Sequence, residues 1–224
     1  KILISPLSKN TKNVKKYKAV YQLSPSFQVQ QNIIMEYVLK HHIQDRIIVL
    51  NEKGEEGKSV YIKNLFFQHE KDIEIYTIEY PNVDSIRNIF REKQVVIIPS
   101  EKKGFVSKVL GSIGGFDSTS FVFGLYNWKK YDNLDIHNLM FLDVKFPDPD
   151  YYNNSNIHDI SFLNLFEKEY NTNQAKYTHN AYNIIMHFCS NFSYFKFNDI
   201  IKGGKVNSYA PLHHYIDYEL VPVE

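Results

Sequence analysis

Hydroxyl, amide, carboxylate and aromatic side chains follow the short apolar runs of this sequence, at the positions where the runs end. Side chains of these kinds suit the binding of a small polar or sugar-like molecule in a cleft, without a reaction. The same residues also have a structural interpretation, because serines cap helices and aromatic rings pack in cores. Both interpretations stay open for this candidate ligand-binding set, which comprises Ser5, Ser8, Ser24, Ser26, Asn51, Glu52, Ser100, Tyr126 and Trp128.

No motif in the sequence supports catalysis. The glycine-rich stretch 111–115 follows an expected helix, whereas a phosphate loop opens a helix after a strand, so we predict a helix C-terminal turn there. Asp117-Ser118 and Asp143 provide no Gly-x-Ser-x-Gly elbow for a hydrolase nucleophile. We therefore predict no catalytic residue, no cofactor and a protein that is not an enzyme. A hydrolase using Asp and His residues of a cleft is a third class of function with no motif behind it.

Metal sites are also not predicted. The adjacent pairs His41-His42 and His213-His214 diverge on a helix or alternate across a strand, so neither pair chelates one ion easily. A group of acidic and amide residues lacks the spacing of a calcium loop, and we interpret it as a hydrated loop: Asp148, Asp150, Asn153, Asn154 and Asp159. The single cysteine, Cys189, lies in an apolar run and is interpreted as a small core residue.

The elements that must position the candidate set are short β-branched runs separated by amphipathic stretches. Runs of four to seven β-formers between polar segments indicate strands buried on both faces, and parallel strands need helix-sized connections. The expected strands are 2–4, 19–23, 46–50, 73–79, 94–98 and 120–124, with a further strand at 139–146 and a strand or hairpin at 215–221. The expected helices are 27–45, 57–69, 83–92, 102–113, 157–170 and 174–189, and 10–18 is expected to be a loop.

The fold class that follows is α/β, with parallel sheets and flanking helices. Such sheets bind ligands beyond the carboxyl ends of their strands, which is where the candidate set lies. An apolar fraction of 43% and an aromatic fraction of 15% supply enough surface for cores. The 26 Lys and Arg nearly balance the 25 Asp and Glu, so nucleic acid is not an expected partner.

No apolar stretch approaches the length of a membrane span, and no signal peptide is visible. Because the sequence begins with Lys1 instead of methionine, we expect that the natural protein has residues upstream of it.

The order of elements resembles the type I periplasmic-binding-protein fold of the leucine/isoleucine/valine-binding family. The resemblance begins with 2–6, 21–26 and 46–50, together with Gln30-Gln31 on the intervening helix. The later segments look closer still to envelope proteins of Bacteroidetes that couple this fold to peptidoglycan-binding LysM modules. These segments are 123–128, 134–135, 146–151, 181–183 and 215–223, with Phe162 and Tyr170.

The resemblance implies two lobes, of which the first is incomplete. A partial first lobe would comprise 1–42 and 150–224, and the second lobe 43–149. In the family several strand-helix units precede the Ser-Pro strand, which here begins at Ile2. An exposed edge of apolar strands is prone to pair with other chains, so we predict that a protein partner or a second copy covers the first strand.

The resemblance does not carry the family's ligand over. Where the family grips an amino acid after Ser-Pro, this chain has Leu7 and Lys9, and Glu56 replaces an aromatic residue. We therefore expect a non-catalytic, periplasmic or envelope-associated binding or scaffolding module, near peptidoglycan or an outer-membrane assembly. The alternative is a receptor that delivers a small polar, amino-acid-like solute to a transporter.

Overall fold

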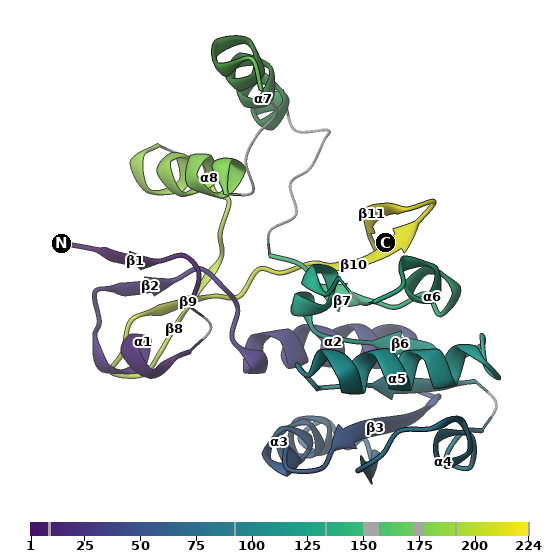
Figure 1. Cartoon of the computed structure of the whole chain (residues 1–224). Helices are drawn as coiled ribbons and strands as arrows, with labels where there is room; N and C mark the ends of the chain where they lie inside the picture. Colours follow the sequence, from purple (N-terminus) through teal and green to yellow (C-terminus); the bar gives the residue numbers. More distant parts are fainter. Residues whose placement is uncertain are drawn as a thin grey trace. The chain divides into compact units, whose positions relative to one another are not determined.

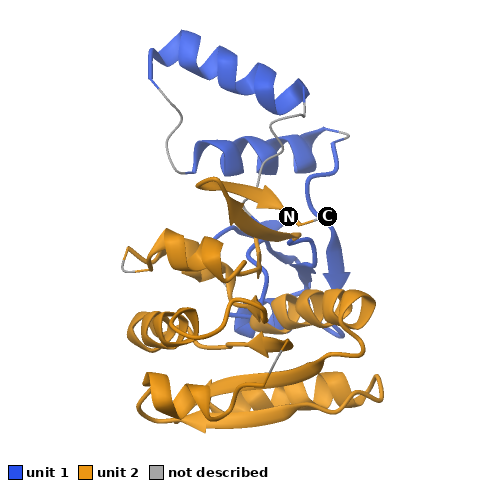
Figure 2. Ribbon diagram, turned by 90° about the vertical axis from the view of Figure 1, so that its right-hand side faces the viewer, with its two compact units in different colours: residues 1–26, 149–210 blue, residues 27–148, 211–224 orange. Residues whose placement is uncertain are grey.

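The chain passes back and forth between two units, each built from segments that are separated in the sequence. The computed structural model describes residues 1–8, 10–91, 93–132, 134–149, 157–172, 177–190 and 192–223. Unit 1 comprises Lys1–Ser26 and Pro149–Ala210, and unit 2 comprises Phe27–Asp148 and Pro211–Glu224 (Figure 2). The α/β class with parallel sheets and flanking helices is confirmed.

Unit 2 contains a sheet of parallel strands in the order β4-β3-β5-β6. Its strands are β3 (Arg46–Glu52), β4 (Glu74–Ile78), β5 (Gln94–Ile97) and β6 (Phe121–Phe123). The helices between and before them are α2 (Phe27–His41), α3 (Glu56–Phe67), α4 (Val83–Arg87) and α5 (Lys103–Gly114), as Figure 1 shows. The predicted strand-helix repeat is confirmed, and the glycine-rich stretch closes α5 with Gly115 as its C-cap.

Both faces of this sheet are buried, which explains the uninterrupted apolar runs. Ile48 and Leu50 belong to one core cluster, which also holds Ile86 of α4 and residues of α5. Ile47 and Val49 belong to a second cluster, with residues of α2 and α3. Successive side chains of a strand point to opposite faces, so each strand supplies both clusters. The alternation fixes which helices cover which face.

A small antiparallel sheet completes unit 2, in the order β11-β10-β7. Its strands are β7 (Phe146–Pro147), β10 (Leu212–Ile216) and β11 (Glu219–Pro222). Asp217 and Tyr218, with φ of 49° and 67°, form the tight turn that the twist of a hairpin favours, so the hairpin prediction is confirmed. The predicted strand over 139–146 is wrong: α6 (Ile136–Phe141) occupies its first part and β7 only its end.

Unit 1 has a mixed sheet in the order β1-β2-β9-β8. Its strands are β1 (Leu3–Ser5), β2 (Val20–Gln22), β8 (Phe197–Asp199) and β9 (Lys205–Asn207), with β1, β2 and β9 parallel. The sequence did not predict β8 and β9. The expected loop 10–18 contains the short helix α1 (Lys12–Lys16), which buries Val14 and leaves its lysines exposed.

Two amphipathic helices of unit 1 pack on each other through aromatic rings. They are α7 (Ile157–Tyr170) and α8 (Thr178–Cys189), whose ribbons belong to unit 1 in Figure 2. The rings of Phe162 and Tyr182 stack with centroids 4.1 Å apart. The interpretation of Cys189 as a core residue is wrong, because it is exposed at the end of α8. No helix of the described residues is long and apolar enough to cross a membrane.

The two units divide the chain differently from the predicted lobes. Residues 27–42 and 211–224 were expected in the first lobe, and both lie in unit 2. Residues 27–42 belong to unit 2 because Ile34 and Val38 of α2 pack in the core with Ile47 of the large sheet. The second segment pairs with β7 through β10. Hydrophobic burial and strand pairing, instead of chain order, set these boundaries.

Candidate functional site

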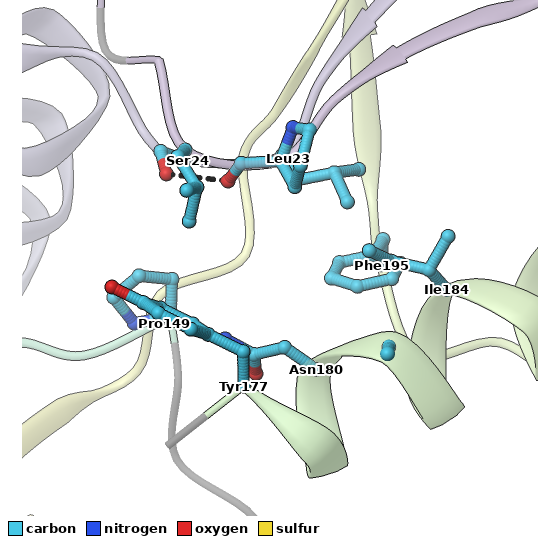
Figure 3. Close-up of a pocket in the computed structure, with 10 residues that line it drawn as sticks. Leu23, Ser24, Pro149, Tyr177, Asn180, Ile184 and Phe195 are labelled. Atoms are coloured by element: carbon cyan, nitrogen blue, oxygen red, sulfur yellow. Dashed lines mark hydrogen bonds between the residues drawn. The ribbon is translucent and has the colours of Figure 1, made fainter. Parts of the chain in front are cut away.

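A cavity of about 280 Å³ lies in unit 1, beyond the carboxyl ends of β1 and β2 (Figure 3). Leu23 N donates to Ser5 O (3.0 Å), and the chain then leaves the sheet at Pro6, which has no N–H to extend the ladder. One turn of α8 and the segment before β8 complete the wall. The lining residues are Pro6, Leu7, Leu23, Ser24, Pro149, Tyr177, Asn180, Ala181, Ile184 and Phe195.

The polar atoms at the strand ends in this cavity are engaged within unit 1. Ser24 Oγ donates to Pro6 O (2.8 Å), the bond drawn in Figure 3. Gln22 Nε2 donates to Ser24 O (2.9 Å), and Asn207 Nδ2 donates to Leu23 O (3.0 Å). These bonds fix the loop after β2 and leave a mainly apolar lining. The cavity can therefore hold an apolar group, with Tyr177 and Asn180 as polar side chains at its wall.

A second set of strand-end residues lies in unit 2, after β3 and β5. Ser100 Oγ donates to Glu52 Oε2 (2.9 Å), and Lys102 Nζ lies 3.0 Å from Glu52 Oε1. The hydrogen bond to Glu52 raises the pKa of Lys102. Asn51 is fully buried and donates through Nδ2 to Glu52 O (2.9 Å), while its Oδ1 has no hydrogen-bond partner among the described residues. Asn51 Oδ1 is thus a buried acceptor at the carboxyl edge of the sheet.

Comparison with known proteins gives a likeness in structure only. No protein-family model and no curated protein sequence matches the chain. Several solved structures do match it. A substrate-binding protein of an ABC transporter from Desulfitobacterium hafniense, in complex with Leu, has a TM-score of 0.67 and 11% identity, covering 99% of this chain and 73% of that chain. A putative branched-chain amino acid ABC transporter from Rhodospirillum rubrum has a TM-score of 0.71 and 9% identity, covering 99% and 72%.

A third match is the C-domain of LpoA from Haemophilus influenzae, a regulator of PBP1A, with a TM-score of 0.55 and 11% identity, covering 99% and 74%. The fold is type I periplasmic-binding-like. At such identities the matches establish the fold of this chain and not a ligand or a partner.

Within this periplasmic-binding-like chain, Ser24 is the one of the five predicted serines that lines the unit 1 cavity, and Ser100 lies in unit 2. Ser5 ends β1, Ser26 is buried directly before α2, and Ser8 is exposed and accepts from Asn10 N (3.3 Å). Leu7 lines the cavity, and Lys9 lies outside the described residues. The structure therefore does not bring these serines together around one cavity.

The two predicted aromatic residues are buried in unit 2. Trp128 is 0% exposed, packs in the core cluster of Ile98 and Leu125, and donates through Nε1 to Ser100 O (3.0 Å). Tyr126 is 4% exposed, and its backbone N–H donates to Gln30 Oε1 (3.2 Å). Trp128 is thus a core residue that supports the loop carrying Ser100 through one hydrogen bond to its backbone.

The interpretation of a hydrated acidic loop is wrong for both of its described members. Asp148 is 1% exposed and accepts from Lys129 Nζ through both carboxylate oxygens (2.6 and 2.7 Å). Asp159 is 3% exposed and accepts from Tyr194 Oη (3.2 Å). The other members, Asp150, Asn153 and Asn154, lie outside the described residues. In the described part of the chain, no group of three or more His, Cys, Asp or Glu is placed to hold a metal ion.

Sequence reasoning missed most of the cavity lining. Tyr177, Asn180 and Ile184 come from α8 and the residue before it, far along the chain from β1 and β2, and apolar lining residues carry no chemical motif. The signal in the sequence was the amphipathic pattern of α8, which predicts a helix with one face against a sheet. It does not predict which sheet end that face covers.

Proposed function

We propose that this chain is a non-catalytic binding or scaffolding module, related to periplasmic solute-binding proteins. The observation that carries the proposal is that Ser24, Glu52 and Ser100, three of the polar strand-end residues, are hydrogen-bonded within their own units. Ser24 is bonded to Pro6 O, and Glu52 to Ser100 and Lys102. An amino acid needs free groups for its carboxylate and ammonium, and an unpaired buried polar group costs about 1–3 kcal/mol.

We propose a periplasmic or envelope location for the module. The matched substrate-binding proteins and LpoA support this proposal. The resemblance to LysM-containing envelope proteins of Bacteroidetes further suggests association with peptidoglycan or with an outer-membrane assembly. The match to a regulatory protein favours a function that is exerted through a protein partner.

The first strand supplies the proposed partner surface. In the described residues β1 is an edge strand, and no strand pairs with its outer side. Ile2 and Leu3 are 59% and 62% exposed. An apolar edge strand with free backbone groups is a template for strand addition. A protein partner or a second copy that covers β1 is therefore part of the proposal.

The alternative is a receptor for a small amino-acid-like solute that feeds a transporter. Two observations favour it: the unit 1 cavity lies where parallel sheets bind ligands, and Asn51 Oδ1 is a buried acceptor with no partner among the described residues. The two functions differ in whether the chain should bind free leucine, the ligand in one of the matched structures. A receptor should bind it, and a scaffold should not.

Native mass spectrometry and calorimetry together separate the two functions. If the chain is a scaffold, it forms a protein assembly and gives no heat with leucine or isoleucine. Leu3→Lys should dissociate the assembly, because a charge on an edge strand opposes strand pairing. The control Ile43→Lys, at a 52% exposed site of unit 2, should leave the assembly intact. A monomer with leucine bound would refute the scaffold.

A pocket-filling variant then tests the receptor directly. Ala181 lines the cavity on an exposed turn of α8, so Ala181→Phe fills the space without disturbing a core. Ala19→Phe is the matched control at an exposed site that does not line the cavity. Leucine binding that Ala181→Phe abolishes and Ala19→Phe preserves would establish the receptor and its site.

A further inference from the structure

Unit 2 contains a second concave site at the end of the sheet opposite to Asn51 and Ser100. His42 lies between α2 and the start of β3, and Phe121 is the first residue of β6. With residues from β10 and β11 they line a groove of about 740 Å³. All of its lining residues belong to unit 2, so the groove is independent of the unit 1 cavity and of the function proposed above.

Two imidazoles line the groove, and Nδ1 of each is hydrogen-bonded to a carboxylate. His42 Nδ1 lies 3.0 Å from Asp45 Oδ2, and His214 Nδ1 donates to Asp143 Oδ1. Because an ionised carboxylate only accepts hydrogen bonds, the proton of each ring sits on Nδ1. Nε2 of each ring is then the atom that a ligand in the groove can meet. The two side chains are 10% and 16% exposed.

Among the residues that line the groove, one ammonium balances one carboxylate, and Asp45 lies beside His42. Lys145, whose side chain is 6% exposed, pairs with Asp143, the one carboxylate among the lining residues. His41 also lines the groove, and Lys93 Nζ lies 5.8 Å from the centroid of the Phe121 ring. Protonation of any imidazole therefore gives the groove a net positive charge, which favours an anion over a cation.

The rest of the groove is apolar. The Phe121 ring lies with its centroid 3.9 Å from that of His42, and Ile216 and Val221 line the groove from the hairpin that also carries His214. Phe121 and the hairpin residues suit a hydrophobic body that is longer than a single carboxylate. An inorganic anion would leave that part of the groove unfilled.

We propose that this groove binds an organic carboxylate with an apolar body, whose oxygens accept hydrogen bonds from Nε2 of His42 and His214. A neutral ring with its proton on Nδ1 has no N–H at Nε2, so each ring that starts neutral must take up one proton before it can donate to the ligand. Tyr37 and Lys145 line the same groove.

The affinity should rise as the pH falls. Burial lowers the pKa of His42, Asp45 opposes this effect, and Lys145 and His41 reinforce it, so the ring is neutral in the empty groove at pH 7. Burial and the charge of Asp143 raise the pKa of Tyr37, which keeps its hydroxyl protonated. Each proton taken up on binding increases the affinity by about tenfold for every pH unit that the solution is lowered, as long as the ring starts neutral.

Calorimetric titration of the full chain with 3-phenylpropionate tests the proposal. We expect tighter binding at pH 6 than at pH 7, by up to about tenfold for each proton taken up. The neutral 3-phenylpropanol lacks the carboxylate, and acetate lacks the apolar body, so both should bind at least tenfold more weakly. Absence of 3-phenylpropionate binding, equal affinity for the alcohol, or an affinity independent of pH would overturn the proposal.

Matched variants locate the ligand. His214→Gln should weaken binding at least tenfold, whereas His69→Gln, at an exposed histidine of unit 2 outside the groove, should not change it. Ile216→Trp fills the apolar part from a 49% exposed position, so it should reduce binding without a loss of fold. Unchanged affinity in both His214→Gln and Ile216→Trp would place the ligand elsewhere and refute the assignment.

Discussion

Gly124→Ala tests whether the packing of Trp128 holds the strand-end loop of unit 2 in place. A Cβ at Gly124 would lie 2.4 Å from Trp128 Cε3 and Cζ3, and 2.7 Å from Cη2. The indole cannot swing aside cheaply, because it is 0% exposed and Nε1 donates to Ser100 O. We therefore expect the ring to be displaced and the hydrogen bond to be lost.

The free energy of unfolding should fall by about 3 kcal/mol. Overpacking a well-packed core costs about 1–3 kcal/mol. Breaking the bond to Ser100 leaves a buried donor and acceptor, which costs about 1–3 kcal/mol more if neither finds water. The loop would lose a support of Ser100, so the bond between Ser100 and Glu52 should weaken as well.

Guanidinium unfolding followed by circular dichroism and by fluorescence gives the measurement. Trp128 is the single tryptophan, so its emission reports directly on the displaced ring. Gly111→Ala is the control: it lies in α5, where an added Cβ would have nothing within 4 Å, and it should stabilise the protein by about 0.5–1 kcal/mol.

A double-mutant cycle with Trp128→Leu isolates the contact. Once the indole is gone, Gly124→Ala should cost less than about 1 kcal/mol, which gives a coupling energy of about 2 kcal/mol. An equal cost of Gly124→Ala in both backgrounds, or a cost within about 0.5 kcal/mol of zero in the wild type, would refute the reasoning.

Two further predictions concern other parts of the chain. Hydrogen bonds from Arg46 lower the pKa of Glu74 to about 2, so the pair stabilises the fold above the unfolded pKa, and its contribution is lost as the pH falls from about 4.3 towards 2. Glu74→Gln should remove that part of the pH dependence in denaturant unfolding, by at most about 1 kcal/mol because Glu74 is 45% exposed; an unaltered profile would contradict this. In unit 1, a Cβ at Gly204 would lie 2.1 Å from Val20 O, so Gly204→Ala should separate β9 from β2. Hydrogen exchange of the β2 amides should rise in Gly204→Ala and not in Gly57→Ala, where the added Cβ has open space.

The strand-helix repeat of unit 2 could be predicted because each of its strands is buried on both faces. Ile47 to Leu50 form an apolar run that no amphipathic helix would show. The segment 139–146 was mistaken because Leu139, Leu142 and Val144 are buried from a helix and the turn after it, in a pattern that also fits a strand. Asp135, whose side chain accepts from His137 N, is the N-cap that marks the helix.

The sites were harder to predict, because they depend on pairings between distant segments. The sequence suggested comparing His213 with its neighbour His214, yet His214 bonds to Asp143, 71 positions earlier. The strand-end rule singled out Ser24, which lines a cavity, and also Ser100 and Glu52, which the structure shows to be hydrogen-bonded to each other. The rule could not show that these polar groups are already hydrogen-bonded within the protein. Those hydrogen bonds decide which atoms remain available to bind a ligand.

The discontinuous build of unit 1 sets an order of events during synthesis. The β2 strand pairs with β9, and Leu23 O accepts from Asn207 Nδ2 across 184 positions. At about 5–20 residues per second, a ribosome needs about 10–40 s after adding Leu23 to add Asn207. All four strands of the large sheet in unit 2 emerge within this interval. β2 therefore has no β9 to pair with until all the strands of the parallel sheet of unit 2 have been synthesised.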